Sequence, residues 1–224
     1  MSKVIFVRHG ESVWNEARRF QGSSDPELSA RGRAQAARVA HRLRADIDPR
    51  AEPGRRGGPV AALYTSPLRR AAATAGAIAE VLGLPVRPEE DLREVGLGEW
   101  EGMTPAEIDA RWGNAYTRWA RDPAALVPPG GEGMDAFSAR VGCAVDRIRS
   151  AHPGADIVIV SHGGAIGTYV CRVLGLGVSS LFRFKLENAS LTEIVEDHVG
   201  LRLALLNDTS HLRDGATPRP SIVT

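Results

Sequence analysis

The chain has 224 residues, and its 28 lysines and arginines against 27 aspartates and glutamates leave a formal net charge of +1. This balance gives no global reason to expect binding to nucleic acid or to an anionic membrane surface, so any preference for anions must be local. With 43% hydrophobic residues, the chain can fold around one substantial core or two smaller ones.

The two cysteines, Cys143 and Cys171, have no close-spaced metal pattern around them. We interpret both as small buried residues in a reducing compartment rather than as a disulfide. No stretch approaches the roughly 18 apolar residues of a membrane span. The first apolar run is also too short for a signal peptide. We therefore expect a soluble, cytoplasmic protein with no membrane contact.

The first predicted element is a buried strand at residues 4–7, which ends directly at Arg8, His9 and Gly10. Such an apolar run is typical of a parallel sheet, and ligands bind at the carboxyl ends of parallel strands. An arginine fork beside an imidazole suits a phosphate, because the guanidinium binds its oxygens and the histidine can act as nucleophile or acid–base group. A surface ion pair for Arg8 and an ordinary polar role for His9 would fit this stretch alone equally well.

A polar loop to about residue 26 follows, and from it Asn15 could donate a side-chain amide to the same site. Arg18 and Arg19 could rim that site, although solvated loop positions are the better interpretation for both. Ser29 is a plausible N-cap for an amphipathic helix from Ala30 to Leu43, lying on the sheet. Residues 46–59 hold three prolines and three glycines and predict a surface loop.

The second buried strand covers residues 60–64, and Ser66 and Pro67 predict the N-cap and first position of the next helix. Arg69 and Arg70 then fall in the first turn, where cations oppose the helix dipole. A bound anion would resolve this conflict, since helix N-termini at strand ends bind phosphate. We therefore expect one of these two arginines to be functional.

A glycine-rich acidic loop spans residues 91–102, and at most one of Glu94, Glu99 and Glu101 is expected to be a catalytic acid. Residues 104–107 have the cap, proline and glutamate of a helix start. The aromatic residues of the following helical stretch, at spacings of three and four, indicate packing rather than a base-stacking platform. They are Trp112, Tyr116 and Trp119.

A further amphipathic helix is predicted over residues 135–151. After it the opening pattern recurs, because the buried strand at 156–160 runs into Ser161, His162 and Gly163. A helix from about Ala165 to Val173 would direct its first backbone N–H groups at a ligand beside His162. Two strand-to-His-Gly junctions in one chain favour a functional interpretation over a structural one. Residues 181–187, 190–196 and 201–206 predict three more strands, the last two forming a hairpin.

These candidates meet at one sheet edge without an aspartate-rich or His/Cys metal constellation. A cation-lined pocket of this kind suits phosphoryl transfer to a histidine, with a carboxylic acid protonating the leaving alcohol.

Four motifs resemble those of the histidine phosphatase superfamily, in its phosphoglycerate mutase-like branch. They are Arg8-His9-Gly10-Glu11, Ser66 with Arg70-Ala71, Leu92 with Glu94, and Ser161-His162-Gly163. The resemblance runs from residue 3 to about residue 212. It implies an α/β fold, a three-layer α/β/α sandwich around a mostly parallel central sheet with an antiparallel edge strand. We expect one domain over residues 1–213 and a polar, mobile tail at 214–224.

The resemblance also implies a role for each matching residue. His9 would be the phosphorylated nucleophile, and Glu94 the general acid that later activates water. Arg8, Arg70 and His162 would hold the phosphoryl group, assisted by the Gly163 backbone N–H, and Asn15 would contribute to the same pocket. The resemblance selects Arg70 rather than Arg69 as the phosphate ligand, and it implies no metal and no cofactor.

Three functions fit the resemblance, and hydrolysis of small phosphorylated metabolites, independent of metal, is the one we favour. The stretches 129–132 and 206–212 are similar to the small, broad-specificity phosphatases. The alternative is a cofactor-dependent phosphoglycerate mutase, for which Arg111, Arg118 and Arg121 could bind a substrate carboxylate. A catalytically inactive phospho-ligand-binding protein is disfavoured, because nucleophile, acid and phosphate ligands are all present. Apolar edge strands could pair two copies in a homodimer.

Overall fold

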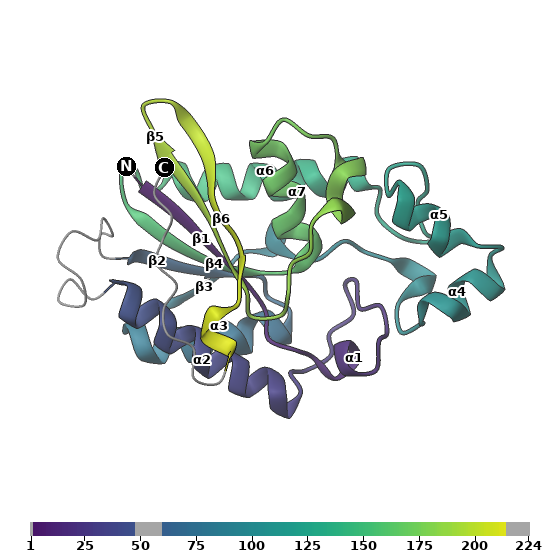
Figure 1. The fold of residues 1–224 in the computed structure, drawn as a ribbon, viewed down its shortest axis with the longest axis horizontal. Helices are drawn as coiled ribbons and strands as arrows, with labels where there is room; N and C mark the ends of the chain where they lie inside the picture. Colours follow the sequence, from purple (N-terminus) through teal and green to yellow (C-terminus); the bar gives the residue numbers. More distant parts are fainter. Residues whose placement is uncertain (1, 48–59, 214–224) are drawn as a thin grey trace.

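The central element is a six-stranded sheet with strand order β3-β2-β4-β1-β5-β6 (Figure 1). The computed structural model describes residues 2–47 and 60–213. Strands β1 (Ser2–Arg8), β2 (Val60–Thr65), β3 (Val86–Pro88) and β4 (Asp156–Ser161) are mutually parallel. The antiparallel part at one edge is the hairpin of β5 (Leu191–Asp197) and β6 (Gly200–Asp208), in which β5 pairs antiparallel with both β1 and β6. The predicted sheet is thus confirmed.

Helices cover both faces of the sheet, which confirms the three-layer α/β/α sandwich (Figure 1). On one face lie α2 (Ala30–Ile47) and α3 (Arg69–Leu82), and on the other α6 (Met134–Ser150) and α7 (Gly163–Val173). Alternate residues of β1 separate the two cores accordingly: Ile5 and Val7 pack with α2 and α3, whereas Val4 and Phe6 pack with α6 and α7. This alternation follows from the two-residue period of a strand.

Three short helices lie beyond the carboxyl ends of the parallel strands. They are α1 (Val13–Glu16), α4 (Pro105–Arg111) and α5 (Ala115–Arg121). Helix α4 has the predicted start, a capping box in which Thr104 and Glu107 satisfy each other's backbone N–H groups. The aromatic residues Trp112, Tyr116 and Trp119 pack into the core on the α6 and α7 face, together with Phe20 and Trp100.

The start of α3 differs from the prediction. The helix begins at Arg69 after Leu68, and Ser66 does not cap it in the predicted way. The Ser66 hydroxyl is instead hydrogen-bonded to His162 at 2.8 Å. Arg70 nevertheless falls in the first turn, as predicted, because the delayed start removes only Pro67 and Leu68 from the helix.

The predicted strand at residues 181–187 is wrong. Residues Val178–Arg183 form a 3₁₀ helix that leads into an irregular segment. The apolar residues that suggested a strand, Leu181, Phe182, Phe184 and Leu186, line a cavity. Their apolar character therefore reflects the cavity wall and not the two-residue period of a sheet.

Both cysteines are free, as expected, but only Cys171 is buried, and Cys143 on α6 is exposed. The predicted loop at 46–59 begins later, since α2 continues to Ile47, and its remainder lies outside the described residues, as does the predicted tail at 214–224. Within the described part of the chain, no helix combines the length and hydropathy that crossing a membrane requires.

Candidate active site

Apart from Asn15 on α1, the candidate residues come from four segments that meet at the carboxyl ends of β1 and β4. Arg8 ends β1 and His9 follows it, Arg70 lies in the first turn of α3, and Glu94 lies in the loop after β3. His162 and Gly163 join β4 to α7. One cavity of about 430 Å³ is lined by all of the predicted site residues except His162: Arg8, His9, Asn15, Arg70, Glu94 and Gly163.

His9 is held by its backbone and by one ring nitrogen. Its N–H donates to the Ser161 carbonyl at 2.9 Å, and its Nδ1 lies 2.7 Å from the Gly10 carbonyl. A carbonyl can only accept a hydrogen bond, so Nδ1 carries the ring proton and the lone pair is on Nε2. Burial first, and then the charges of Arg70 and Arg8, hold the His9 pKa well below its ordinary value. The ring is therefore neutral at neutral pH, as a nucleophile must be.

Gly10 permits the chain after His9 to approach α2 closely. A Cβ at this position would lie 2.4 Å from the Gly32 carbonyl oxygen on α2. The Gly10 N–H donates to Thr74, and the Thr74 hydroxyl donates to the Arg70 carbonyl at 2.8 Å. The segment that follows His9 is therefore tied to the helix that carries Arg70.

Arg70 is fully buried, whereas its neighbour Arg69 is exposed and pairs with Glu27. The Arg70 guanidinium donates to the carbonyls of Ser24 at 2.7 Å and Gly22 at 2.9 Å. Burial lowers the pKa of Arg70 to about 10, so the side chain keeps its charge at neutral pH. This arrangement agrees with the selection of Arg70 over Arg69 for the pocket.

Three buried side-chain nitrogens near His9 have no hydrogen-bond partner among the described residues. They are Arg8 Nε, Arg70 Nε and His162 Nδ1. Arg8 donates from its Nη1 to the Leu186 carbonyl, which fixes the guanidinium but leaves Nε unused. A buried donor without a partner is costly, so this group of donors is best satisfied by an anion with several oxygens.

The His162 ring packs edge-on against the His9 ring, with the two ring centroids 5.1 Å apart. Its Nε2 is 2.8 Å from the Ser66 hydroxyl, and the Ser66 oxygen accepts a hydrogen bond from the Leu68 N–H. Burial first, and then the charge of Arg70, lower the His162 pKa well below its ordinary value. If the Ser66 proton points to Nε2, the neutral His162 ring carries its own proton on Nδ1, where it can be donated to a ligand.

Glu94 is fixed at both carboxylate oxygens by backbone N–H groups. Oε1 accepts from Val95 at 3.0 Å, and Oε2 accepts from Gly164 in the first turn of α7 at 2.9 Å. A Cβ on Gly164 would lie 2.3 Å from Glu94 Oε1, so only glycine leaves room for the carboxylate. One of the α7 N–H groups predicted to face a ligand thus binds Glu94.

The other two candidate acids have structural positions. Glu101 accepts hydrogen bonds from the backbone and hydroxyl groups of Ser23 and Ser24, and from the Leu97 N–H. Burial raises its pKa, but these hydrogen bonds outweigh burial and the net shift is downward. Glu99 forms an exposed ion pair with Arg111.

Asn15 lines the cavity, and its Oδ1 accepts from the Ser12 N–H and from Asn188 Nδ2. Asn188 also donates to the His9 carbonyl at 3.1 Å, so it links Asn15 to the nucleophile's backbone. The contacts of Asn188 and the hydrogen bond between the Ser66 hydroxyl and His162 were not predicted from the sequence. Neither has a local signal, because each acts on a residue at least 96 positions away in the chain.

The rest of the cavity is mainly apolar, with cations at its rim. Arg18 and Arg19 both line it, although solvated positions were the preferred interpretation. Arg19 is engaged by Glu107 and the Gly102 carbonyl. The apolar lining comes from the loop at 20–22, the loop at 95–97, α5 and residues 181–186, and includes Phe20, Val95, Leu97, Trp119, Leu181, Phe182, Phe184 and Leu186. Among the described residues, no group of three or more His, Cys, Asp or Glu side chains is placed to hold a metal ion.

Known proteins with similar sequences and structures cover nearly the whole chain. The model of the histidine phosphatase superfamily (branch 1) matches residues 4–209. Phosphoserine phosphatase 1 of Hydrogenobacter thermophilus is 34% identical over 213 residues, which are 95% of each chain. "Probable phosphoglycerate mutase GpmB" of Photorhabdus laumondii is 34% identical over 202 residues, 88% of this chain and 86% of that protein. The solved structure of a mycobacterial glucosyl-3-phosphoglycerate phosphatase with VO3 superposes with a TM-score of 0.81 at 33% identity, covering 92% of this chain and 99% of the other.

Proposed function

The chain belongs to the histidine phosphatase superfamily (branch 1), and from this premise we propose that it hydrolyses phosphomonoesters of small metabolites through a phosphohistidine on His9. One observation carries the proposal. A neutral His9 with its lone pair on Nε2 lies among three buried donors, on Arg8, Arg70 and His162, that have no partner in the described part of the chain. A phosphoryl group has one electrophilic centre for the histidine and three oxygens for these donors.

The reaction has two steps. First, His9 Nε2 forms a bond to phosphorus and the ester P–O bond breaks, while the acid form of Glu94 gives its proton to the departing alkoxide. Next, the Glu94 carboxylate takes a proton from water, the water oxygen bonds to phosphorus, and the P–N bond to His9 breaks. Inorganic phosphate leaves and both side chains return to their starting states.

The charge of the transferring group would be met by protein side chains and not by a metal. Arg8 and Arg70 supply two full positive charges, and His162 Nδ1 supplies a further donor. The mycobacterial relative that was solved with VO3, an oxyanion, shares this fold at 33% identity. That similarity supports the proposal that this chain also binds an oxyanion.

The substrate's alcohol part would lie against the apolar wall, which Leu97, Trp119 and Phe182 help to form. Arg18 at the rim could meet a second anionic group, and no ion pair joins it to another described residue. Phosphoserine and phosphorylated glycerates have such a group, and the names of two relatives include them. We therefore place phosphomonoesters with a carboxylate or an apolar part first in the substrate panel.

The geometry supports hydrolysis over the alternative, mutase activity. The carboxylate ligands considered for a mutase were Arg111, Arg118 and Arg121, and none of them is among the described residues that line the cavity. Arg111 pairs with Glu99 and stacks over Trp112. Because a probable mutase is 34% identical to this chain, the assay must measure both activities.

The test is release of inorganic phosphate in EDTA from phosphoserine, 3-phosphoglycerate, sugar phosphates and 4-nitrophenyl phosphate, with His9→Ala as the control. 3-Phosphoglycerate is assayed with and without 2,3-bisphosphoglycerate. Phosphate release that EDTA leaves unchanged and His9→Ala abolishes is the expected result. Conversion to 2-phosphoglycerate with little free phosphate would instead establish the mutase. Equal activity of His9→Ala, or loss of activity in EDTA, would contradict the proposal.

A further inference from the structure

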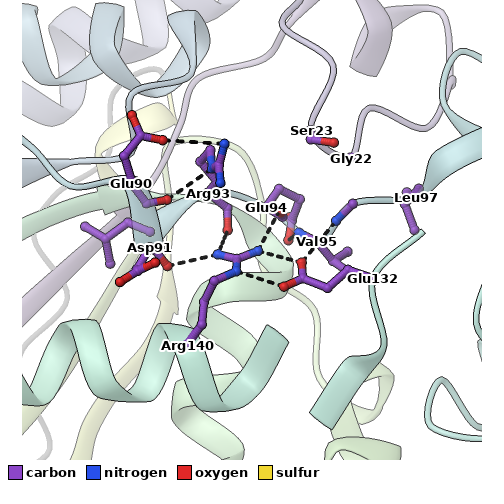
Figure 2. Close-up of polar contacts among 12 residues, drawn as sticks. Gly22, Ser23, Glu90, Asp91, Arg93, Glu94, Val95, Leu97, Glu132 and Arg140 are labelled. Carbon is purple, nitrogen blue, oxygen red and sulfur yellow. Dashed lines mark hydrogen bonds and ion pairs between the residues drawn. The ribbon is translucent and has the colours of Figure 1, made fainter. Parts of the chain in front are cut away.

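We propose that Arg140 and Glu132 are positioning residues for Glu94, holding its loop so that the carboxyl can protonate the leaving group. The inference rests on the proposed function, because it needs Glu94 to be the general acid. Arg140 lies on α6, and Figure 2 shows its guanidinium between the segment at 91–94 and the carboxylate of Glu132.

The first observation concerns the backbone that carries Glu94. Arg140 Nη1 donates to the carbonyls of Asp91 at 2.9 Å and Arg93 at 3.0 Å, and Nη2 donates to the carbonyl of Glu94 at 3.2 Å (Figure 2). The remaining carbonyl, of Leu92, accepts from the Ser161 hydroxyl at 2.8 Å. All four successive carbonyls of residues 91–94 are therefore bound by side chains from α6 and β4.

The second observation is that Glu132 joins this segment to a second loop. Its carboxylate forms a two-point ion pair with Arg140, through Nε at 2.9 Å and Nη2 at 2.6 Å. Glu132 Oε2 also accepts from the Gly96 N–H at 3.3 Å, and the Glu132 N–H donates to the Gly96 carbonyl at 2.7 Å. The loop at 128–133 thus fixes the chain two residues after Glu94, while Arg140 fixes it up to Glu94.

The third observation is that the Arg140 guanidinium is itself held in place. Its centre lies 5.0 Å from the ring centroid of Phe137, which is fully buried one helical turn earlier on α6. The Arg140 side chain is 20% exposed, and that of Glu132 is 27% exposed. A fork that serves three carbonyls and a carboxylate at fixed angles is a role that only arginine can fill.

The consequence for catalysis follows from what a general acid does. An alkyl alkoxide is a poor leaving group and needs a proton from Glu94, whereas 4-nitrophenolate leaves without one. A displaced Glu94 therefore slows the cleavage of alkyl phosphates more than the cleavage of 4-nitrophenyl phosphate. A general loss of folding would slow both equally.

The experiment measures kcat/KM for phosphoserine and for 4-nitrophenyl phosphate in Arg140→Gln and Glu132→Gln. If phosphoserine is not hydrolysed, the best alkyl phosphate of the panel replaces it. We expect kcat/KM for the alkyl phosphate to fall about 10- to 100-fold in Arg140→Gln, with a much smaller loss for the nitrophenyl ester. Glu132→Gln keeps the side-chain volume and should show the same bias to a lesser degree.

Arg147→Gln is the matched control, because Arg147 lies on the same helix and contacts the neighbouring Glu89 and Asp91, but only through their side-chain carboxylates and not through the backbone. The ratio of kcat/KM for phosphoserine to kcat/KM for 4-nitrophenyl phosphate should be the same in Arg147→Gln as in the unmodified protein. Glu94→Gln is the reference for complete loss of the acid. An unchanged ratio in folded Arg140→Gln and Glu132→Gln, with a changed ratio in Glu94→Gln, would overturn the positioning role alone. An unchanged ratio in Glu94→Gln would overturn the acid role on which it rests.

Arg140→Lys and the double variant add one more distinction. Lysine keeps the charge but lacks the fork, so the leaving-group bias should persist in Arg140→Lys. Because the two residues act as one unit, the double variant Arg140→Gln/Glu132→Gln should be no more biased than Arg140→Gln. Multiplicative effects in the double variant, or full recovery by lysine, would contradict the geometric argument.

Discussion

Glu94 and Gly164 show how a single missing side chain shapes the site. The Gly164 N–H donates to Glu94 Oε2 at 2.9 Å, and a Cβ on Gly164 would lie 2.3 Å from Oε1. The N-terminus of α7 can therefore bind the carboxylate only if its second residue lacks a Cβ. This glycine is needed for close approach, not for an unusual backbone angle.

We predict that Gly164→Ala displaces the Glu94 carboxyl and lowers kcat/KM for alkyl phosphates about 10- to 100-fold, with a smaller effect on 4-nitrophenyl phosphate. Gly76→Ala on α3 is the control, because a Cβ there meets nothing within 4 Å. Steady-state kinetics with the two substrates check this. Activity of Gly164→Ala equal to that of Gly76→Ala would show that Glu94 does not need this space.

At this scale the sequence was informative about which residues meet, and less so about how they are held. The strand-end motifs located His9 and His162, and the resemblance separated Arg70 from Arg69 in agreement with their burial. Ser66 was interpreted as a helix cap, whereas its hydroxyl binds His162. Hydrogen bonds between residues so distant in the chain have no local pattern from which to predict them.

At the element scale, two loops hold the Arg70 side chain in place. The loop at 22–24 supplies the two carbonyls that bind Arg70, and Glu101 of a second loop binds the N–H and hydroxyl groups of Ser23 and Ser24. A Cβ on Gly22 would collide with the Glu101 carboxylate at 2.3 Å. Glu101 thus links the loop that binds Arg70 to the Leu97 N–H, three residues after Glu94.

We predict that Glu101→Gln lowers the free energy of unfolding by about 1–3 kcal/mol, since an amide cannot accept all of these hydrogen bonds and leaves partly buried donors unpaired. It should also raise KM, because the loop that holds Arg70 loosens. Glu99→Gln, two residues away, loses only an exposed ion pair with Arg111 and should change the free energy of unfolding by less than about 0.5 kcal/mol. Urea unfolding of both variants checks this, and equal stability losses would contradict it.

Regular elements were predictable because their periodicity is local, and the segment at 181–187 was not, for a physical reason. Apolar residues there line the cavity, and a cavity wall imposes no fixed period on the chain. The loops that hold Arg70 and Glu94 were recognised as loops, but their pairing depends on contacts such as those of Arg140 on a helix 46 residues away from Glu94.

At the scale of the whole molecule, the fold brings two neutral histidines, His9 and His162, together with two arginines, Arg8 and Arg70, in the interior beside the cavity. Burial and the arginine charges lower the pKa of both His9 and His162. In the unfolded chain these histidines titrate near their ordinary value of about 6.5. Below that pH the unfolded state binds protons that the folded state does not, so folding stability decreases as pH falls.

We predict full stability above about pH 6.5 and a loss on acidification from there toward the lowered folded pKa values, with a slope of up to about 1.4 kcal/mol per pH unit for each histidine. Urea unfolding between about pH 7.5 and about pH 5 measures this loss of stability. The range extends roughly one unit to either side of the ordinary histidine pKa. His9→Gln removes one of the two groups and should show a shallower loss. Stability that is constant or rises over this range would show that the histidines are not held neutral.

The central claim is a covalent phosphoryl group on His9, and trapping that intermediate tests it most directly. The enzyme is mixed with its best substrate, quenched within milliseconds in alkali, which preserves phosphohistidine, and digested for mass spectrometry. We predict one added phosphoryl group on the peptide that contains His9, and none in His9→Ala. The group should accumulate in Glu94→Gln mixed with 4-nitrophenyl phosphate, whose leaving group needs no acid, because water is not activated in that variant. Steady turnover with no phosphorylated His9 peptide in either the unmodified protein or Glu94→Gln would contradict the account.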